Sequence, residues 1–304
     1  MPRVSVILPT KDRPAELAEA LDSLADQTYP DFEVVLVNDG GRDVSGLAEE
    51  YRASFEIVHV HREKSGGASA ARNTGLEAAS GELIAYLDDD DRFHPHHLST
   101  LVTALDAESS DVAYSDAELC YFERRGSERK VVERKLVFSR DFDPGALLVY
   151  NYVPMPCVMH ARNCLKRSGA FDESLSSLVD WDLFIRLSLH FHLIHVPLVT
   201  AEYLKEADAA RRNNLLSADG MRNLANLAAI YRKYSKIADS KPGVVVEQAS
   251  YFLRRLKQAA AGEHAAGHTE KADLLAGLAA ELAAARDNPG RARLKMQKIY
   301  ETLL

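Results

Sequence analysis

The stretch Leu83-Ile84-Ala85-Tyr86-Leu87-Asp88-Asp89-Asp90-Asp91 joins a short apolar run to four consecutive carboxylates. The apolar part predicts a buried strand, so the carboxylates lie where that strand ends. In an extended chain residues two apart face the same way, and Asp88 and Asp90 can therefore converge on one ligand. Carboxylates this close repel by roughly 1 kcal/mol in water and about 4 kcal/mol near a protein surface, a conflict that a cation resolves. Oxygen ligands favour hard ions such as Mg²⁺ or Mn²⁺. The alternative interpretation is a solvated acidic turn.

Apolar runs alternate with helical patterns on the N-terminal side of this stretch. The sequence predicts strands at 4–8, 32–37 and 55–60, and helices from residue 14, around 47–51 and over 68–79. The alternation indicates an α/β fold with a mostly parallel central sheet that is flanked by helices. Ligands of such sheets bind beyond the carboxyl ends of the strands, where Thr10, Asp39 and Asp88 fall.

The pattern continues beyond the aspartates and then changes character. A helix is predicted from Pro95, a strand at 112–115, a hairpin over 117–135, a helix that Asp180 heads, and a strand over 190–203. Beyond residue 214 the chain is rich in Leu, Ala, Lys, Arg and Glu at helical spacing. Helices are predicted there at 215–234, 244–261 and 271–285, separated by Pro-Gly breaks.

Composition narrows the class of protein. The 304 residues carry 37 Lys and Arg against 45 Asp and Glu, a net charge of −8, so no basic field favours nucleic acid as a partner. Three cysteines without metal-ligand spacing predict a reducing compartment. No leader precedes the first strand and no apolar run reaches the roughly 18 residues of a membrane span, which predicts a cytoplasmic protein.

The C-terminal helices allow two kinds of contact. They predict either a homodimer interface or a cover for an acceptor cleft. The final stretch of the chain, beyond the Pro-Gly break at 289–290, carries Arg291, Arg293, Lys295 and Lys298 beside apolar residues, which allows peripheral contact with an anionic membrane. A solvated basic face on an ordinary helix is the other interpretation.

Several motifs in order resemble the GT-A glycosyltransferases of family 2, over roughly residues 3–200. The matching pieces are Val4–Thr10 with Arg13, Phe32–Gly40, Ala71–Gly75, Gly81–Ile84 with Asp88–Asp91 and Pro95, Phe171–Glu173, and Asp180–Leu183 with Arg186. The resemblance implies a domain at 1–213, with a nucleotide-sugar half at about 1–115 and an acceptor half at about 116–213. Residues 214–304 form a helical extension.

The resemblance also implies a role for each matched residue. Asp180 would be the catalytic base, and Asp90 with Asp88 would hold Mn²⁺ or Mg²⁺. The nucleotide sugar would be bound by Thr10, Asp12, Arg13, Asp39, Arg72, Asp88 and Asp89. Each also has a plain structural reading: Asp39 as a turn residue, Arg72 as a surface arginine, and Asp180 as a helix cap.

Four positions depart from the family pattern. They are Asp12, Asn38, Gly41 and Val179. The departures at Asn38 and Gly41 leave open which nucleobase the donor nucleotide carries. The Tyr-Arg-x-His motif of the family is not recognisable around Tyr203, and the histidines at 160, 190, 192 and 195 are expected to have packing or surface roles.

The implied activity is metal-dependent, inverting transfer from a nucleotide-diphosphate sugar, with UDP-sugars favoured. The acceptor would be a hydroxyl of a glycan, a lipid-linked glycan or a protein, in bacterial surface polysaccharide or glycoconjugate synthesis. The alternatives are a binding scaffold with weakened catalysis and a sugar-phosphate nucleotidyltransferase. The latter needs a Gly-rich basic loop after the first strand, and residues 9–14 do not form one. A dinucleotide-binding dehydrogenase lacks its G-x-G-x-x-G fingerprint.

Overall fold

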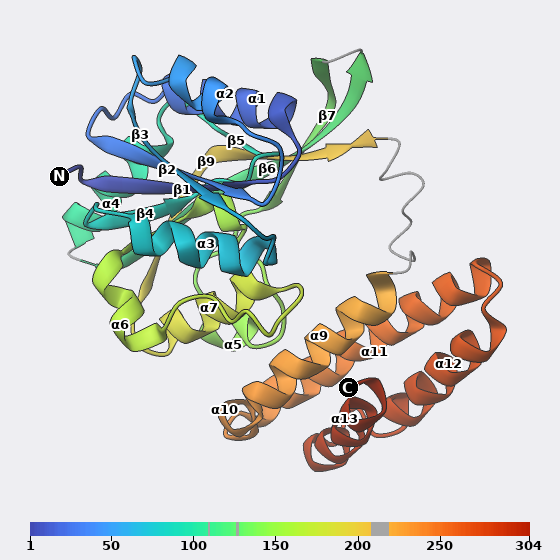
Figure 1. Cartoon of the computed structure of the whole chain (residues 1–304). Coiled ribbons are helices and arrows are strands. Elements are labelled where there is room, and N and C mark those ends of the chain that lie inside the picture. Colours follow the sequence, from blue (N-terminus) through green and yellow to red (C-terminus); the bar gives the residue numbers. More distant parts are fainter. Residues whose placement is uncertain (109, 126–127, 208–218) are drawn as a thin grey trace. The chain divides into compact units, whose positions relative to one another are not determined.

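The computed structural model describes residues 1–108, 110–125, 128–207 and 219–304, which form two compact units (Figure 1). The first unit comprises Met1–Phe142, Tyr152–Ser174 and Val179–Ala207. The second comprises Asp143–Asn151, Leu175–Leu178 and the described part of Asp208–Leu304. The domain boundary predicted at residues 213–214 lies outside the described residues and stays a prediction.

The first unit is built around one mixed sheet. Its strands are β1 (Val4–Thr10), β2 (Phe32–Asp39), β3 (Glu56–Arg62), β4 (Leu83–Tyr86), β5 (Arg92–Phe93), β6 (Val112–Arg125), β7 (Glu128–Phe138), β8 (Val158–Ala161) and β9 (Leu193–Glu206). Their order is β3-β2-β1-β4-β8-β6-β9-β5, and β7 pairs with β6. Strands β3, β2, β1 and β4 are all parallel, whereas β8 is antiparallel to both of its neighbours.

Helices cover both faces of the parallel strands. Those of the first unit are α1 (Pro14–Ala25), α2 (Ser45–Glu50), α3 (Gly67–Ala78), α4 (His97–Glu108), α6 (Leu165–Ser168) and α7 (Val179–Ser188), with 3₁₀ turns η1 (Met155–Cys157) and η2 (Arg162–Cys164). Successive residues of β1 point to opposite faces. Val4, Val6 and Leu8 join the apolar core shared with α1, α2 and α4. Ile7 instead faces α3, at Gly75.

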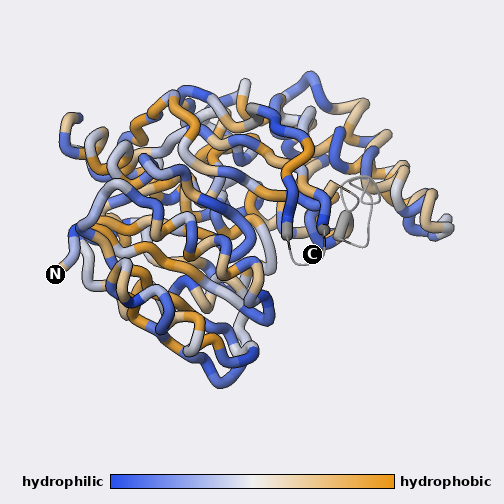
Figure 2. Tube along the Cα trace, turned by 90° about the horizontal axis from the view of Figure 1, so that it is seen from above, coloured by the Kyte–Doolittle hydropathy of each residue, from blue (hydrophilic) through white to orange (hydrophobic). Residues whose placement is uncertain are grey.

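The fold class predicted from the sequence is confirmed. Strand β2 is buried at every position, as a strand covered on both faces requires. Figure 2 shows the same division, with apolar runs through the interior and hydrophilic residues gathered at the turns. Two elements differ from expectation. Strand β6 continues to Arg125 because it pairs with β7 as a long hairpin (Figure 1), and α4 begins at His97 rather than at Pro95.

Two predicted features fall on residues that are not described. The hairpin turn predicted around Gly126 and Ser127 and the first part of the helix predicted from residue 215 lie outside the described residues.

Gly81, just before β4, allows the chain to approach β1 closely. A Cβ there would lie 2.7 Å from the backbone nitrogen of Ser5 and 2.8 Å from the carbonyl carbon of Val4. We expect Gly81→Ala to lower the free energy of unfolding by about 1–3 kcal/mol, measured by urea denaturation, because backbone must move. Gly46→Ala is the control, because nothing lies within 4 Å of its Cβ and the change should stabilise by about 0.4–1 kcal/mol. Equal stability of the two variants would contradict this.

The second unit is helical. It contains α5 (Pro144–Leu147), α9 (Asp219–Lys233), α10 (Ser235–Asp239), α11 (Pro242–Ala265), α12 (Thr269–Ala283) and α13 (Pro289–Leu303). Prolines at the first helical positions of α11 and α13 suit helix starts, and Asn288 caps α13 by accepting from the amide of Arg291. Phe252 packs edge-on against both Tyr231 and Tyr300 in its core. Among the described residues, no helix has the length and apolar character that crossing a bilayer requires.

Candidate functional site

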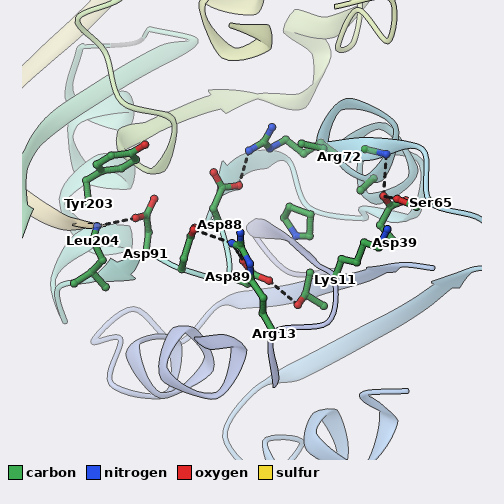
Figure 3. A pocket seen from close by; sticks show the side chains of 16 residues that line it. Lys11, Arg13, Asp39, Ser65, Arg72, Asp88, Asp89, Asp91, Tyr203 and Leu204 are labelled. Atoms are coloured by element: carbon green, nitrogen blue, oxygen red, sulfur yellow. Dashed lines mark hydrogen bonds and ion pairs between the residues drawn. The ribbon is translucent and has the colours of Figure 1, made fainter. Parts of the chain in front are cut away.

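The carboxyl ends of β1, β2 and β4 border one cavity of about 460 Å³ in the first unit (Figure 3). Parallel strands end at the same edge of the sheet, which brings residues far apart in the sequence together. The sequence-predicted residues that line it are Thr10, Arg13, Asp39, Arg72, Asp88, Asp89 and Asp90. Asp12 and Asp180 are not part of its lining.

The acidic turn after β4 is held by hydrogen bonds from β1, from the loop that follows β1 and from β9. Thr10 donates to Asp89 at 2.7 Å, and Arg13 reaches Asp89 at 3.2 Å and Asp90 at 2.8 Å. Asp91 accepts from the amide of Leu204 on β9 at 3.0 Å (Figure 3). The side chain of Asp91 is thus buried against β9.

Burial and mutual repulsion oppose ionisation of this turn. Burial raises the pKa of Asp89 to about 6, with Asp90 adding repulsion. The pKa values of Asp90 and Asp91 are also raised, first by burial and then by the charge of Asp88. A cation at the turn would reverse these shifts. Over the described ranges, no three or more His, Cys, Asp or Glu side chains are arranged to hold a metal ion by themselves.

Arg72 forms one wall of the cavity from α3. Its guanidinium is buried, pairs with Asp88 at 2.5 Å and lies 5.5 Å from the ring centre of Phe171. The arginine is therefore not a solvated surface residue. Its ion pair removes part of the negative charge of the acidic turn.

Asp39 is engaged by the loop that precedes α3. Its carboxylate accepts from the Ser65 hydroxyl at 2.7 Å and from the amides of Gly66 and Gly67 at 3.0 and 2.9 Å, and Arg62 lies 2.9 Å away. Burial disfavours the charge, but these hydrogen bonds and Arg62 lower the pKa of Asp39 below its ordinary value. Three hydrogen-bond donors and the guanidinium of Arg62 surround the carboxylate in this conformation, so a nucleobase N–H would compete with them for its oxygens.

Asp12 and Asp180 lie beside the cavity. Asp12 has a left-handed backbone (φ 57°) and accepts from the amide of Arg42 at 2.9 Å, which ties the loop after β1 to the loop after β2. Asp180 lies in the first turn of α7. Burial raises its pKa, while the nearby charge of Arg72 lowers it. That interaction places Asp180 within electrostatic reach of the Arg72–Asp88 pair.

Sequence reasoning missed several lining residues. Ser65 and Gly67 belong to the glycine-containing segment just before α3, whose composition by itself indicates only that a helix follows. Tyr203 and Leu204 come from β9 and carry no local motif. Two of the histidines that were expected to have packing or surface roles make side-chain contacts in the first unit: His160 meets the Tyr86 hydroxyl at 2.8 Å, and His195 meets Asp116 and Asp141.

Comparisons with known proteins point to one family. The model of the family "Glycosyl transferase family 2" matches residues 5–154. The uncharacterised glycosyltransferase YwdF of Bacillus subtilis is 34% identical over 202 residues, 66% of this chain and 74% of that protein. EpsJ, another uncharacterised glycosyltransferase of that organism, is 36% identical over 131 residues, 43% of this chain and 37% of its own length.

Solved structures share the fold. The Staphylococcus aureus TarS 1–349 complex with UDP-GlcNAc aligns with a TM-score of 0.58 and 19% identity, over 99% of this chain and 92% of that one. The mannosyltransferase PcManGT of Pyrobaculum calidifontis, in complex with GDP-Man and Mn²⁺, aligns with a TM-score of 0.58 and 19% identity, over 98% and 87%. Both are GT-A glycosyltransferases, and this architecture is the one predicted from the sequence.

Proposed function

Because the chain belongs to glycosyl transferase family 2, we propose that it transfers a sugar, with inversion, from a nucleotide-diphosphate sugar to an acceptor hydroxyl. One observation carries the proposal. Thr10, Asp39, Arg72 and the acidic turn, which come from separate parts of the sequence, line a single cavity at the strand ends. The acceptor would be a glycan, a lipid-linked glycan or a protein in bacterial surface polysaccharide synthesis.

The nucleotide would lie between β1 and the loop before α3. Asp39 and Thr10 border this part of the cavity, and the cations of Lys11 and Arg13 suit a diphosphate. Asp12 would contribute to nucleotide binding indirectly, because its carboxylate accepts from the amide of Arg42 and so positions the loop after β2. The complexes of TarS with UDP-GlcNAc and of PcManGT with GDP-Man support a nucleotide sugar as donor, and a UDP-sugar is the form we favour.

The acidic turn fits a hard divalent cation. The cavity exposes the carboxylates of Asp88 and Asp90, whose partners Arg72 and Arg13 compensate only part of the charge. Two carboxylates are what Mg²⁺ commonly takes from protein when phosphates and water complete its shell, which accounts for the lack of a larger cluster among the described residues. Asp88 and Asp90 would hold Mn²⁺ or Mg²⁺. When bound, the ion neutralises the charge of the departing diphosphate.

Asp180 would remove the proton from the acceptor hydroxyl. The acceptor oxygen then bonds to the anomeric carbon as the bond from that carbon to the diphosphate oxygen breaks, and the proton ends on the Asp180 carboxylate. A base works best when its pKa is near the working pH, and burial raises the pKa of Asp180 in that direction. A single displacement of this kind inverts the anomeric centre.

The proposal is tested by measuring thermal stability with UDP-sugars and GDP-sugars, with and without Mn²⁺. A donor that binds only the folded state raises Tm, because at a concentration one hundred times its Kd it adds about 2.7 kcal/mol to the free energy of unfolding. We expect at least one donor to stabilise the protein in a Mn²⁺-dependent way and to release nucleotide diphosphate when acceptor is present. Stabilisation without turnover on any acceptor would favour a catalytically weakened scaffold. No response to any donor would contradict the proposal.

A further inference from the structure

We propose that Arg129, on β7, is a positioning residue for the acidic turn, because its guanidinium holds the main-chain carbonyl of Asp90 in place. The inference rests on the proposed function, which assigns that turn to a divalent cation and the donor's diphosphate. Arg129 lies outside the cavity that these groups would occupy. It therefore acts on Asp90 rather than on a ligand.

Two hydrogen bonds fix the guanidinium. Its Nη1 donates to the carbonyl oxygen of Asp90 at 2.9 Å, and its Nε donates to Glu19 on α1, also at 2.9 Å. The ring of Phe122 lies 5.2 Å from its central carbon. The planar fork of an arginine can make both bonds at once, which a single ammonium cannot do with the same geometry.

The burial of Arg129 sets it apart from Arg13, whose guanidinium also contacts Asp90. Its side chain is 1% exposed, whereas that of Arg13, which meets the Asp90 carboxylate at 2.8 Å, is 52% exposed. Ion pairs at such exposed positions restrain a partner weakly. Arg129 is thus the stronger restraint on Asp90.

The contacts of Arg129 are not those of a charge placed only for stability. Its partner Glu19 is shared with Arg92, so Arg129 is not needed to neutralise that carboxylate. Its Nη2 is buried without a hydrogen-bond partner among the described residues, at a cost of about 1–3 kcal/mol. The guanidinium therefore makes its hydrogen bond to Asp90 at a cost in stability, because its Nη2 stays without a partner among the described residues.

The turn itself gives the contact its effect. The amide of Asp91 donates to the carbonyl of Asp88 at 3.1 Å, which closes the turn around Asp89 and Asp90. Holding the Asp90 carbonyl fixes the peptide that follows Asp90 and restrains the Cα from which the Asp90 carboxylate extends. Residues that support a metal ligand in this way commonly change metal affinity by about 10–100-fold when they are replaced.

The experiment compares Arg129→Met and Arg129→Lys with Arg134→Met in the full chain. Arg134 is a matched control, because it lies on the same strand and its hydrogen bonds go to Glu118, Cys120 and Glu202 rather than to the turn. Each variant is titrated with Mn²⁺ in the presence of UDP or GDP, whichever stabilises the wild type, and the rise in Tm is followed. Electron paramagnetic resonance of free Mn²⁺ gives an independent binding curve.

We expect Arg129→Met to raise the Mn²⁺ concentration at half-saturation about tenfold or more, Arg129→Lys to raise it less, and Arg134→Met to stay within about twofold. A folded Arg129→Met that binds Mn²⁺ like the wild type would overturn the inference and leave the proposed function standing. If Arg129→Met does not fold, an unchanged Mn²⁺ concentration at half-saturation in Arg129→Lys overturns the inference instead. A wild type that shows no Mn²⁺-dependent response would overturn both.

Discussion

Asp180→Asn is expected to lower kcat for sugar transfer by about 10²–10⁴-fold, the usual contribution of a general base. Asn has nearly the same shape as Asp but cannot accept the proton of the acceptor hydroxyl. Asp180 is not part of the cavity lining, so binding of the donor should change little. Steady-state kinetics of transfer, beside Mn²⁺-dependent donor binding measured by Tm, separates the two effects.

The pH profile provides the check on this assignment. Burial raises the pKa of Asp180, so the wild-type rate should fall as the pH drops through that raised value, where the carboxylate becomes protonated. Above it the rate should level off. At saturating Mn²⁺, where the cation reverses the raised pKa values of Asp89 and Asp90, Asp180→Asn should lack this fall in rate at low pH and stay at its low rate across the pH range. A variant that keeps both the rate and the fall at low pH would remove Asp180 from the mechanism.

Asp90→Asn is expected to lower transfer by about 10²–10⁴-fold, because a metal ion contributes several kcal/mol to the stabilisation of the departing charge. The change keeps the shape of the side chain and removes the charge that would hold the ion. It also loses the ion pair with Arg13, which is half exposed and contributes little to stability. The measurement is the rate of nucleotide diphosphate release as a function of Mn²⁺ concentration.

A charge-matched control accompanies Asp90→Asn. Asp106→Asn removes the same charge from α4, where the carboxylate pairs with Arg3 at the surface, 2.8 Å away. It should leave the Mn²⁺ dependence unchanged. If Asp90→Asn keeps the wild-type Mn²⁺ dependence, the ion does not bind at this turn.

The cavity residues that stand at strand ends could be predicted from the sequence, whereas the residues that contact them from distant elements could not. Thr10, Asp39 and Asp88 each follow an apolar strand, and the strand period together with the parallel arrangement is enough to place them at one edge of the sheet. Helices α9, α11 and α12 of the helical unit were likewise predicted from helical spacing and from Pro-Gly breaks, whereas the short helices α5 and α10 were not. These are local patterns, which a chain shows before it folds.

Local sequence patterns do not predict contacts between residues that lie far apart in the sequence. Ser65, in the loop before α3, donates a hydrogen bond to the carboxylate of Asp39, and the amide of Leu204 donates one to Asp91. Neither hydrogen bond has a sequence pattern near the residues involved. The same is true of Arg129, which reaches Asp90 only because the β6–β7 hairpin folds back beside α1.

The amino-acid order alone specified the strands, the helices and the side chains that stand at the strand ends, because those depend on periodicity and on the direction of the chain. Which donors satisfy each buried carboxylate depended on the folded arrangement. A buried charge takes its partners from whatever elements surround it, and those neighbours exist only after the chain has folded.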